Sequence, residues 1–148
     1  MTEKRKKYLC TGLILLNLAF IWGNSLMNGT QSGNLSGGIM AWINSVLGLD
    51  EAGAQMLHLL IRKAAHFTEF ACLGMLLAWN CRMTGEKHGM IFPALLAMAA
   101  ALIDESIQLI TPDRGPSLTD VWIDSFGALA GIMLLTVGHH LITKRRHN

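Results

Sequence analysis

Four long apolar runs are the feature that most limits what this chain can fold into. They lie at about residues 8–27, 64–83, 90–110 and 121–142. Each is close to the roughly 20 residues that an α-helix needs to cross the hydrocarbon core of a bilayer. Of the 148 residues, 51% are hydrophobic and 15% charged, which excludes an ordinary soluble domain. We therefore predict an all-α protein, a transmembrane four-helix bundle that forms one domain over residues 1–148.

A turn-rich linker and a short apolar stretch separate the first two runs. The linker covers residues 28–38, and the apolar stretch 39–49 is too short to span a membrane, so we expect it to form a short extracytoplasmic interfacial helix. Asp50 is a suitable N-cap for a helix that begins near Glu51. If that helix continued to Met83 it would be about 50 Å long, so its first turns must project from the bilayer or lie at its surface.

Basic residues are divided unequally between the two sides of such a bundle. One side holds nine of them, namely Lys4, Arg5, Lys6, Lys7, Arg82, Lys87, Lys144, Arg145 and Arg146. The other side holds Arg62, Lys63 and Arg114. The positive-inside rule therefore predicts that both termini are cytoplasmic, and that the 28–63 segment and the 111–120 loop are extracytoplasmic.

Four carboxylates lie inside the predicted spans, those of Glu69, Asp104, Glu105 and Asp124. Each costs about 2.5–3.5 kcal/mol on an insertion scale when it is charged. All of them are near the outer ends of their helices. At 100° per residue, Gln108 lies about 40° from Asp104, so the two share a face. The sequence thus predicts one polar layer whose candidate ligand-binding residues are Lys63, His66, Glu69, Asp104, Glu105, Gln108, Arg114, Asp120 and Asp124. Taken singly, Lys63 and Asp120 could equally be residues that snorkel to the membrane surface.

The fourth run combines a polar face with a face of small residues. Asp120, Asp124, Gly127 and Gly131 lie on one side of the predicted helix. Gly127 and Gly131 form a GxxxG pair, which favours close approach of a second helix.

Two segments carry a family resemblance, RKAAHFTEFACLGMLLAW and DESIQLITPDRGPSLTDVWIDSFGALAG. Over about residues 63–131 they resemble the VanZ-like family of small bacterial membrane proteins, which is named for low-level resistance to the glycopeptide antibiotic teicoplanin. The matching positions are Lys63, His66, Asp104, Glu105, Gln108, Arg114, Asp120 and Gly127. The chain departs from the family pattern at Asp124, where Asn is frequent, and at Phe70, where Tyr is frequent. The resemblance implies a multi-pass protein of the bacterial cell membrane.

The first functional hypothesis is that an outer-leaflet polar cleft binds or modulates a lipid head group, a cell-wall precursor or a glycopeptide antibiotic. Lys63, Arg114 and protonated His66 would hold phosphate, while the carboxylates and Gln108 would accept hydrogen bonds from sugar or amide groups. Membrane lipids are therefore the expected partners. A nucleic-acid partner is excluded, because the net charge is only +2 and the basic residues form short runs.

The alternative is a membrane enzyme that acts on a lipid-linked phosphate or sugar, with His66 and Glu105 as candidate catalytic acid and base. No nucleophile elbow, zinc motif or phosphate loop appears in the sequence. Histidine and paired carboxylates can also hold a divalent metal, but we assign no metal and no cofactor. An ion pathway is disfavoured, because the inner halves of the second and third runs carry almost no ionisable residues. Cys10, Cys72 and Cys81 predict no disulfide framework.

Overall fold

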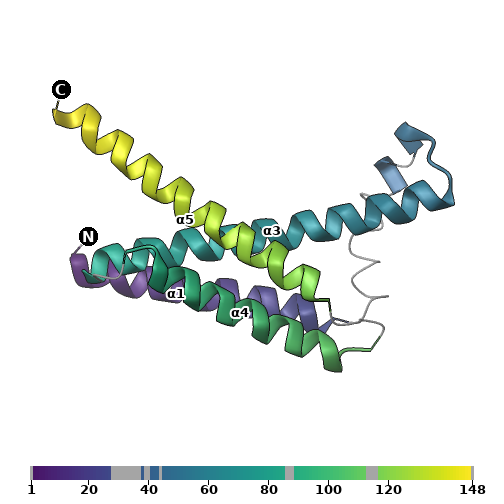
Figure 1. Cartoon of the computed structure of the whole chain (residues 1–148), viewed down its shortest axis with the longest axis horizontal. Coiled ribbons are helices and arrows are strands. Elements are labelled where there is room, and N and C mark those ends of the chain that lie inside the picture. The colour runs from purple at the N-terminus through teal and green to yellow at the C-terminus, as the bar shows by residue number, and fades with distance from the viewer. Residues whose placement is uncertain are drawn as a thin grey trace.

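Four long helices form most of the structure, a computed structural model that describes residues 2–27, 38, 41–43, 45–85, 89–112 and 117–147. They are α1 (Glu3–Leu26), α3 (Glu51–Thr84), α4 (Ile91–Ile110) and α5 (Leu118–His147). The described residues contain no strand, which confirms the all-α prediction. Successive helices run in opposite directions, so the N-terminus, the end of α3 and the C-terminal end of α5 lie toward one end of the molecule (Figure 1).

The limits of α3 follow from its terminal residues. Asp50 caps the helix, because its side chain accepts a hydrogen bond from the Gly53 amide at 2.9 Å. At the other end, Gly85 adopts a left-handed conformation with φ of 75°, which glycine allows without strain, and the helix stops there. The predicted start near Glu51 is confirmed. The first turns of α3 extend beyond the ends of α1 and α4, as its length requires (Figure 1).

The predicted interfacial helix is only partly described. Residues 41–43 and 45–47 are helical, while 39, 40 and 44 lie outside the described residues, as does nearly all of the 28–38 linker. The extracytoplasmic position of this segment stays a prediction.

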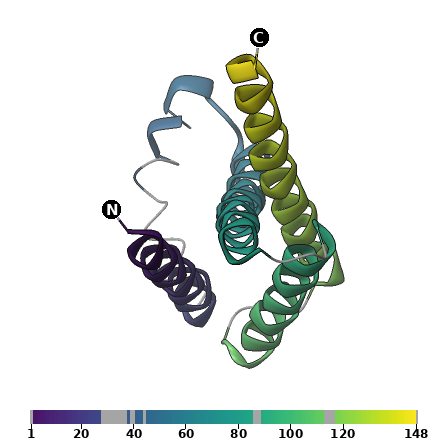
Figure 2. The same cartoon turned by 90° about the vertical axis from the view of Figure 1, so that its left-hand side faces the viewer.

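The helices do not all contact one another equally. α3 and α4 contact each other, and both contact α1 and α5. α1 and α5 lie on opposite sides of α3, as the end-on view shows (Figure 2). α3 thus lies between α1 and α5, and its most extensive contact is with α5.

Glycines allow α3 and α5 to pack backbone against backbone. A Cβ atom added to Gly127 would collide with the Phe67 carbonyl, and one added to Gly131 would collide with the Ala71 carbonyl. Gly74 on α3 makes the reciprocal approach to Ala128. The close approach predicted from the GxxxG pair is confirmed, and it uses a third glycine on the partner helix.

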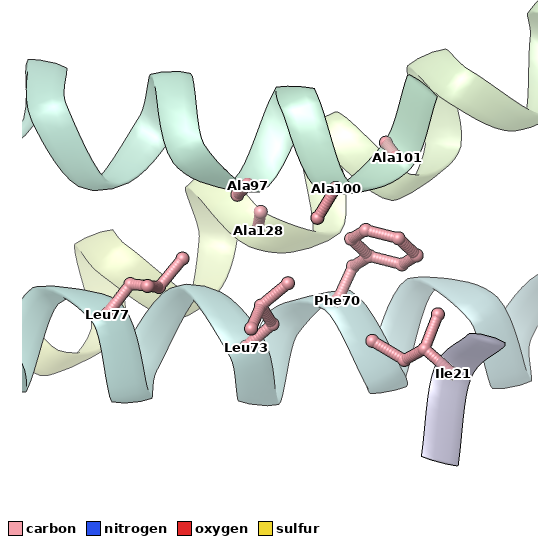
Figure 3. Close-up of a cluster of buried hydrophobic side chains, with 8 residues drawn as sticks. All are labelled: Ile21, Phe70, Leu73, Leu77, Ala97, Ala100, Ala101 and Ala128. Atoms are coloured by element: carbon pink, nitrogen blue, oxygen red, sulfur yellow. The ribbon is translucent and has the colours of Figure 1, made fainter. Parts of the chain in front are cut away.

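Alanines and a few larger side chains form the interior, while many other large aliphatic side chains point outward. The buried cluster contains Ile21, Phe70, Leu73, Leu77, Ala97, Ala100, Ala101 and Ala128 (Figure 3). Leu95, Leu102, Leu109, Leu134 and Leu141 are each more than half exposed. An outer surface of this kind is unfavourable in water and suits the apolar phase of a bilayer.

Three of the described helices are long and apolar enough to cross a membrane by length and composition: α1, α4 and the Leu118–Arg145 part of α5. α3, which contains the predicted span 64–83, is not among them. His66, Glu69 and Asn80 lower the hydropathy of this segment. The count of four spans therefore stays a prediction, while the membrane character of the protein rests on the three apolar helices.

Candidate functional site

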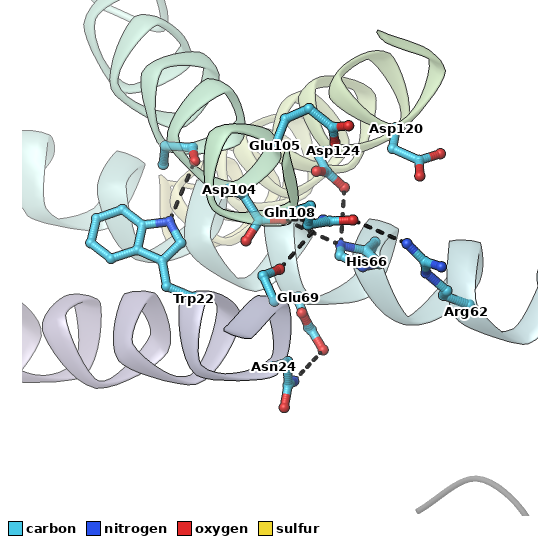
Figure 4. A network of polar contacts seen from close by, with 12 residues as sticks. Trp22, Asn24, Arg62, His66, Glu69, Asp104, Glu105, Gln108, Asp120 and Asp124 are labelled. Atoms are coloured by element: carbon cyan, nitrogen blue, oxygen red, sulfur yellow. Dashed lines mark hydrogen bonds and ion pairs between the residues drawn. The ribbon is translucent and has the colours of Figure 1, made fainter. Parts of the chain in front are cut away.

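A layer of polar side chains crosses the molecule where α1 and α4 end and α5 begins (Figure 4). Residues from all four helices contribute to it. We call it the polar layer and define it by Asn24, Ser25, Arg62, Lys63, His66, Glu69, Asp104, Glu105, Gln108, Asp120 and Asp124. Because α3 contacts both α4 and α5, its side chains reach partners on both helices.

A histidine and two aspartates form the deepest part of the layer. His66 Nδ1 lies 3.9 Å from Asp104 Oδ2 and 3.7 Å from Asp124 Oδ1. All three side chains are buried, and one ligand atom from each lies within 4.8 Å of the other two. Three helices therefore bring one imidazole and two carboxylates together, in a geometry that could hold a metal ion.

Gln108 links this cluster to the rest of the layer. Its Nε2 donates to Asp104 Oδ2 at 2.8 Å and to Ser25 Oγ at 3.4 Å. Its Oε1 accepts a hydrogen bond from Arg62 Nη2 at 3.0 Å. The Asp104 contact is the one that the helical phase predicts, since the two residues are four apart on α4. A fully buried amide that uses both its ends in this way fixes the distance between α1, α3 and α4.

The edge of the layer is more open. Lys63 Nζ lies 2.6 Å from Asp120 Oδ1, and their side chains are 39% and 14% exposed, so this ion pair is reachable from outside. Nearby, the Ser117 amide donates to Glu105 Oε1, which ties the start of α5 to α4. On the α1 side, Asn24 Nδ2 donates to Glu69 Oε1 at 3.1 Å.

The described part of the layer has an excess of acidic groups. It contains five carboxylates, those of Glu69, Asp104, Glu105, Asp120 and Asp124, but the only Lys or Arg residues in it are Arg62 and Lys63. One carboxylate oxygen of Asp104 lies within 4.8 Å of one of Asp124. Two charges at such a distance repel each other by roughly 3 kcal/mol even at an effective dielectric constant near 20. The layer therefore costs stability unless a cation or a proton offsets part of its charge.

The structure brings together every predicted site residue that it describes, and Arg114 lies outside the described residues. Within the predicted layer, Asp104 lies 3.9 Å from His66. Glu105, which the enzyme hypothesis pairs with His66, accepts a hydrogen bond from Ser117.

Sequence reasoning did not include Arg62, Asn24 or Ser25 among the site residues. Arg62 directly precedes Lys63, but only the three-dimensional arrangement shows that it turns toward Gln108. Asn24 is one of the few strongly polar residues of the first apolar run, and this is the feature of the sequence that could have marked it as a site residue.

The model of the VanZ/LLP1 family matches residues 9–139, which extend from the first turns of α1 to late in α5 and include the whole polar layer. No curated protein and no solved structure matches the chain.

Proposed function

The chain belongs to the VanZ/LLP1 family and is a membrane protein, and we propose that its polar layer binds the phosphate-bearing head group of a membrane lipid at the outer surface. The observation that carries this proposal is the position of Arg62 and Lys63, two partly exposed cations at the edge of a buried polar layer. A lipid-linked cell-wall precursor fits the same chemistry. A role in glycopeptide tolerance would be a consequence of binding such a precursor at the cell surface.

The two cations and the deeper polar groups have different roles in the proposed site. The guanidinium of Arg62 has five N–H donors, of which one contacts Gln108, so others remain for a phosphate oxygen. Lys63 is a point charge whose ion pair with Asp120 is partly solvated, and a phosphate can replace or join that partner at modest cost. The amide and carboxylates behind them hold these cations in place and can accept hydrogen bonds from sugar hydroxyls.

The proposal requires that the polar layer lie on the outer side of the membrane. We propose four spans, with α3 crossing the bilayer beside α1, α4 and α5, because it contacts all three and runs antiparallel to α1 and α4. The nine-to-three division of basic residues then puts both termini in the cytoplasm and the layer outside.

Cysteine labelling tests this topology. In a variant with alanine at Cys10, Cys72 and Cys81, a thiol reagent that cannot cross the membrane should label Ser117→Cys in intact cells. It should label Thr84→Cys only after the cells are permeabilised. The reverse pattern would put the layer in the cytoplasm and exclude the topology.

Native mass spectrometry tests the binding itself. We expect the detergent-purified protein to retain a polyprenyl phosphate through energies at which it has lost the matching polyprenol, because the two lipids differ only in the head group. Equal retention of both lipids would mean that the protein recognises only the polyprenyl tail, and would contradict the proposal. Teicoplanin added to the same protein separates direct binding of a glycopeptide from binding of a phosphate lipid.

A further inference from the structure

We infer that His66, Asp104 and Asp124 form a binding site for a divalent transition-metal ion. The ion would sit behind the edge formed by Arg62 and Lys63 and would complete the proposed head-group site, so in that respect the inference rests on the proposed function. The ion itself can be detected without any lipid.

Convergence of the three ligand groups is the first argument. They come from three different helices, α3, α4 and α5, and yet one atom of each lies within 4.8 Å of the other two (Figure 4). Three ligands at ordinary zinc distances from a shared ion are separated by about 3.4 Å. The imidazole already lies 3.7 and 3.9 Å from the two carboxylates, so small side-chain movements would complete the coordination.

Buried carboxylate oxygens are the second and independent argument. Asp104 and Asp124 are 0% and 1% exposed, and the Oδ1 atom of each accepts no hydrogen bond from any residue that the structure describes. A buried carboxylate oxygen without a hydrogen bond is costly because it has lost its water, and the imidazole at 3.7 Å from Asp124 Oδ1 is too distant to replace that bond. A cation between the two carboxylates would contact Asp124 Oδ1, the unbonded oxygen that faces the imidazole, and would reduce the repulsion between the two groups.

The ligand types indicate which ion fits. One imidazole nitrogen with two carboxylate oxygens suits zinc or manganese, whereas calcium and magnesium prefer oxygen ligands alone. Gln108, which donates to Asp104 at 2.8 Å, would act as the outer partner that orients a ligating carboxylate. Three protein ligands leave at least one coordination position, which a phosphate oxygen could occupy. A lipid phosphate could then bind in a layer whose own charge is otherwise repulsive to it.

Zinc titration tests the inference. The protein is purified without a histidine tag, in a background with alanine at His139 and His140, because these exposed imidazoles on α5 could also bind zinc. After dialysis against a chelator, calorimetric titration with zinc chloride should show about one ion per chain. Asp104→Asn and Asp124→Asn should each weaken zinc binding by about tenfold or more, because a neutral amide is a poor ligand.

Asp120→Asn is the matched control, since Asp120 belongs to the same layer but pairs with Lys63 outside the three-residue cluster. It should bind zinc like the parent protein. If the folded parent binds neither zinc nor manganese, or if all three variants bind alike, the inference is wrong. Lipid retention that persists after chelation in a protein without metal affinity would leave the head-group proposal intact. Zinc binding without lipid retention would support the metal site and contradict the head-group proposal.

Discussion

Leucine at Gly131 should prevent α3 and α5 from packing and leave little folded protein. A Cβ alone at this position collides with the carbonyl of Ala71, and the obstacle is backbone rather than a side chain that could rotate away. Overpacking of a core costs about 1–3 kcal/mol when neighbours can adjust. Here the two helices must separate, which also exposes the buried faces of His66 and Asp124, so we expect a loss of more than about 3 kcal/mol.

Thermal unfolding in detergent and the yield of monodisperse protein measure this effect. Gly131→Ala should already lower the unfolding temperature, and Gly131→Leu should lower it much further. Gly138→Leu is the control, because Gly138 lies on the same helix and no described atom comes within 4 Å of an added Cβ. Equal stability of the Gly131→Leu and Gly138→Leu proteins would contradict the packing described for α3 and α5.

The features that were predicted correctly from the sequence depend on residues close together in the chain. The start of α3 depends on Asp50, which caps its own helix, and the contact between Asp104 and Gln108 follows from a spacing of four residues on one helix. The close approach at Gly127 and Gly131 also follows from a pattern within one segment. Each of these features is fixed by residues that are near one another in the chain.

Contacts between distant segments were not predictable in the same way. The choice of Gln108 as the partner of Arg62, and of Asp120 as the partner of Lys63, depends on how α3 lies against α4 and α5. Hydropathy likewise predicts that α3 is a helix without showing that it spans a membrane. Two residues of the polar layer, His66 and Glu69, also lower the hydropathy of α3, so the proposed site lies in the predicted span that composition identifies least well.

Alanine at both Arg62 and Lys63 should largely abolish binding of a phosphate lipid. Each cation supplies a charge-assisted hydrogen bond worth about 1.5–3 kcal/mol, so loss of both corresponds to about a hundredfold or more in affinity. Exchange of the two cations, Arg62→Lys combined with Lys63→Arg, keeps both charges and should retain most of the binding. Arg82→Ala removes a cation from the opposite end of α3 and should leave the affinity unchanged.

A scaffold role for the layer makes a different prediction. If Arg62 serves only to hold Gln108, and Lys63 only to hold Asp120, their loss should lower the unfolding temperature in proportion to any loss of binding. Measuring unfolding temperature beside affinity in the same detergent therefore separates a binding site from a structural network.

The most direct measurement is the dissociation constant of a polyprenyl phosphate for the parent protein, for the Arg62→Ala, Lys63→Ala double variant and for Arg82→Ala, each with its unfolding temperature. A binding site predicts that the double variant loses about a hundredfold in affinity while it still unfolds near the parent temperature, and that Arg82→Ala behaves as the parent does. If the double variant binds as tightly as the parent, or if Arg82→Ala weakens binding to the same extent, the polar layer is not where the head group binds.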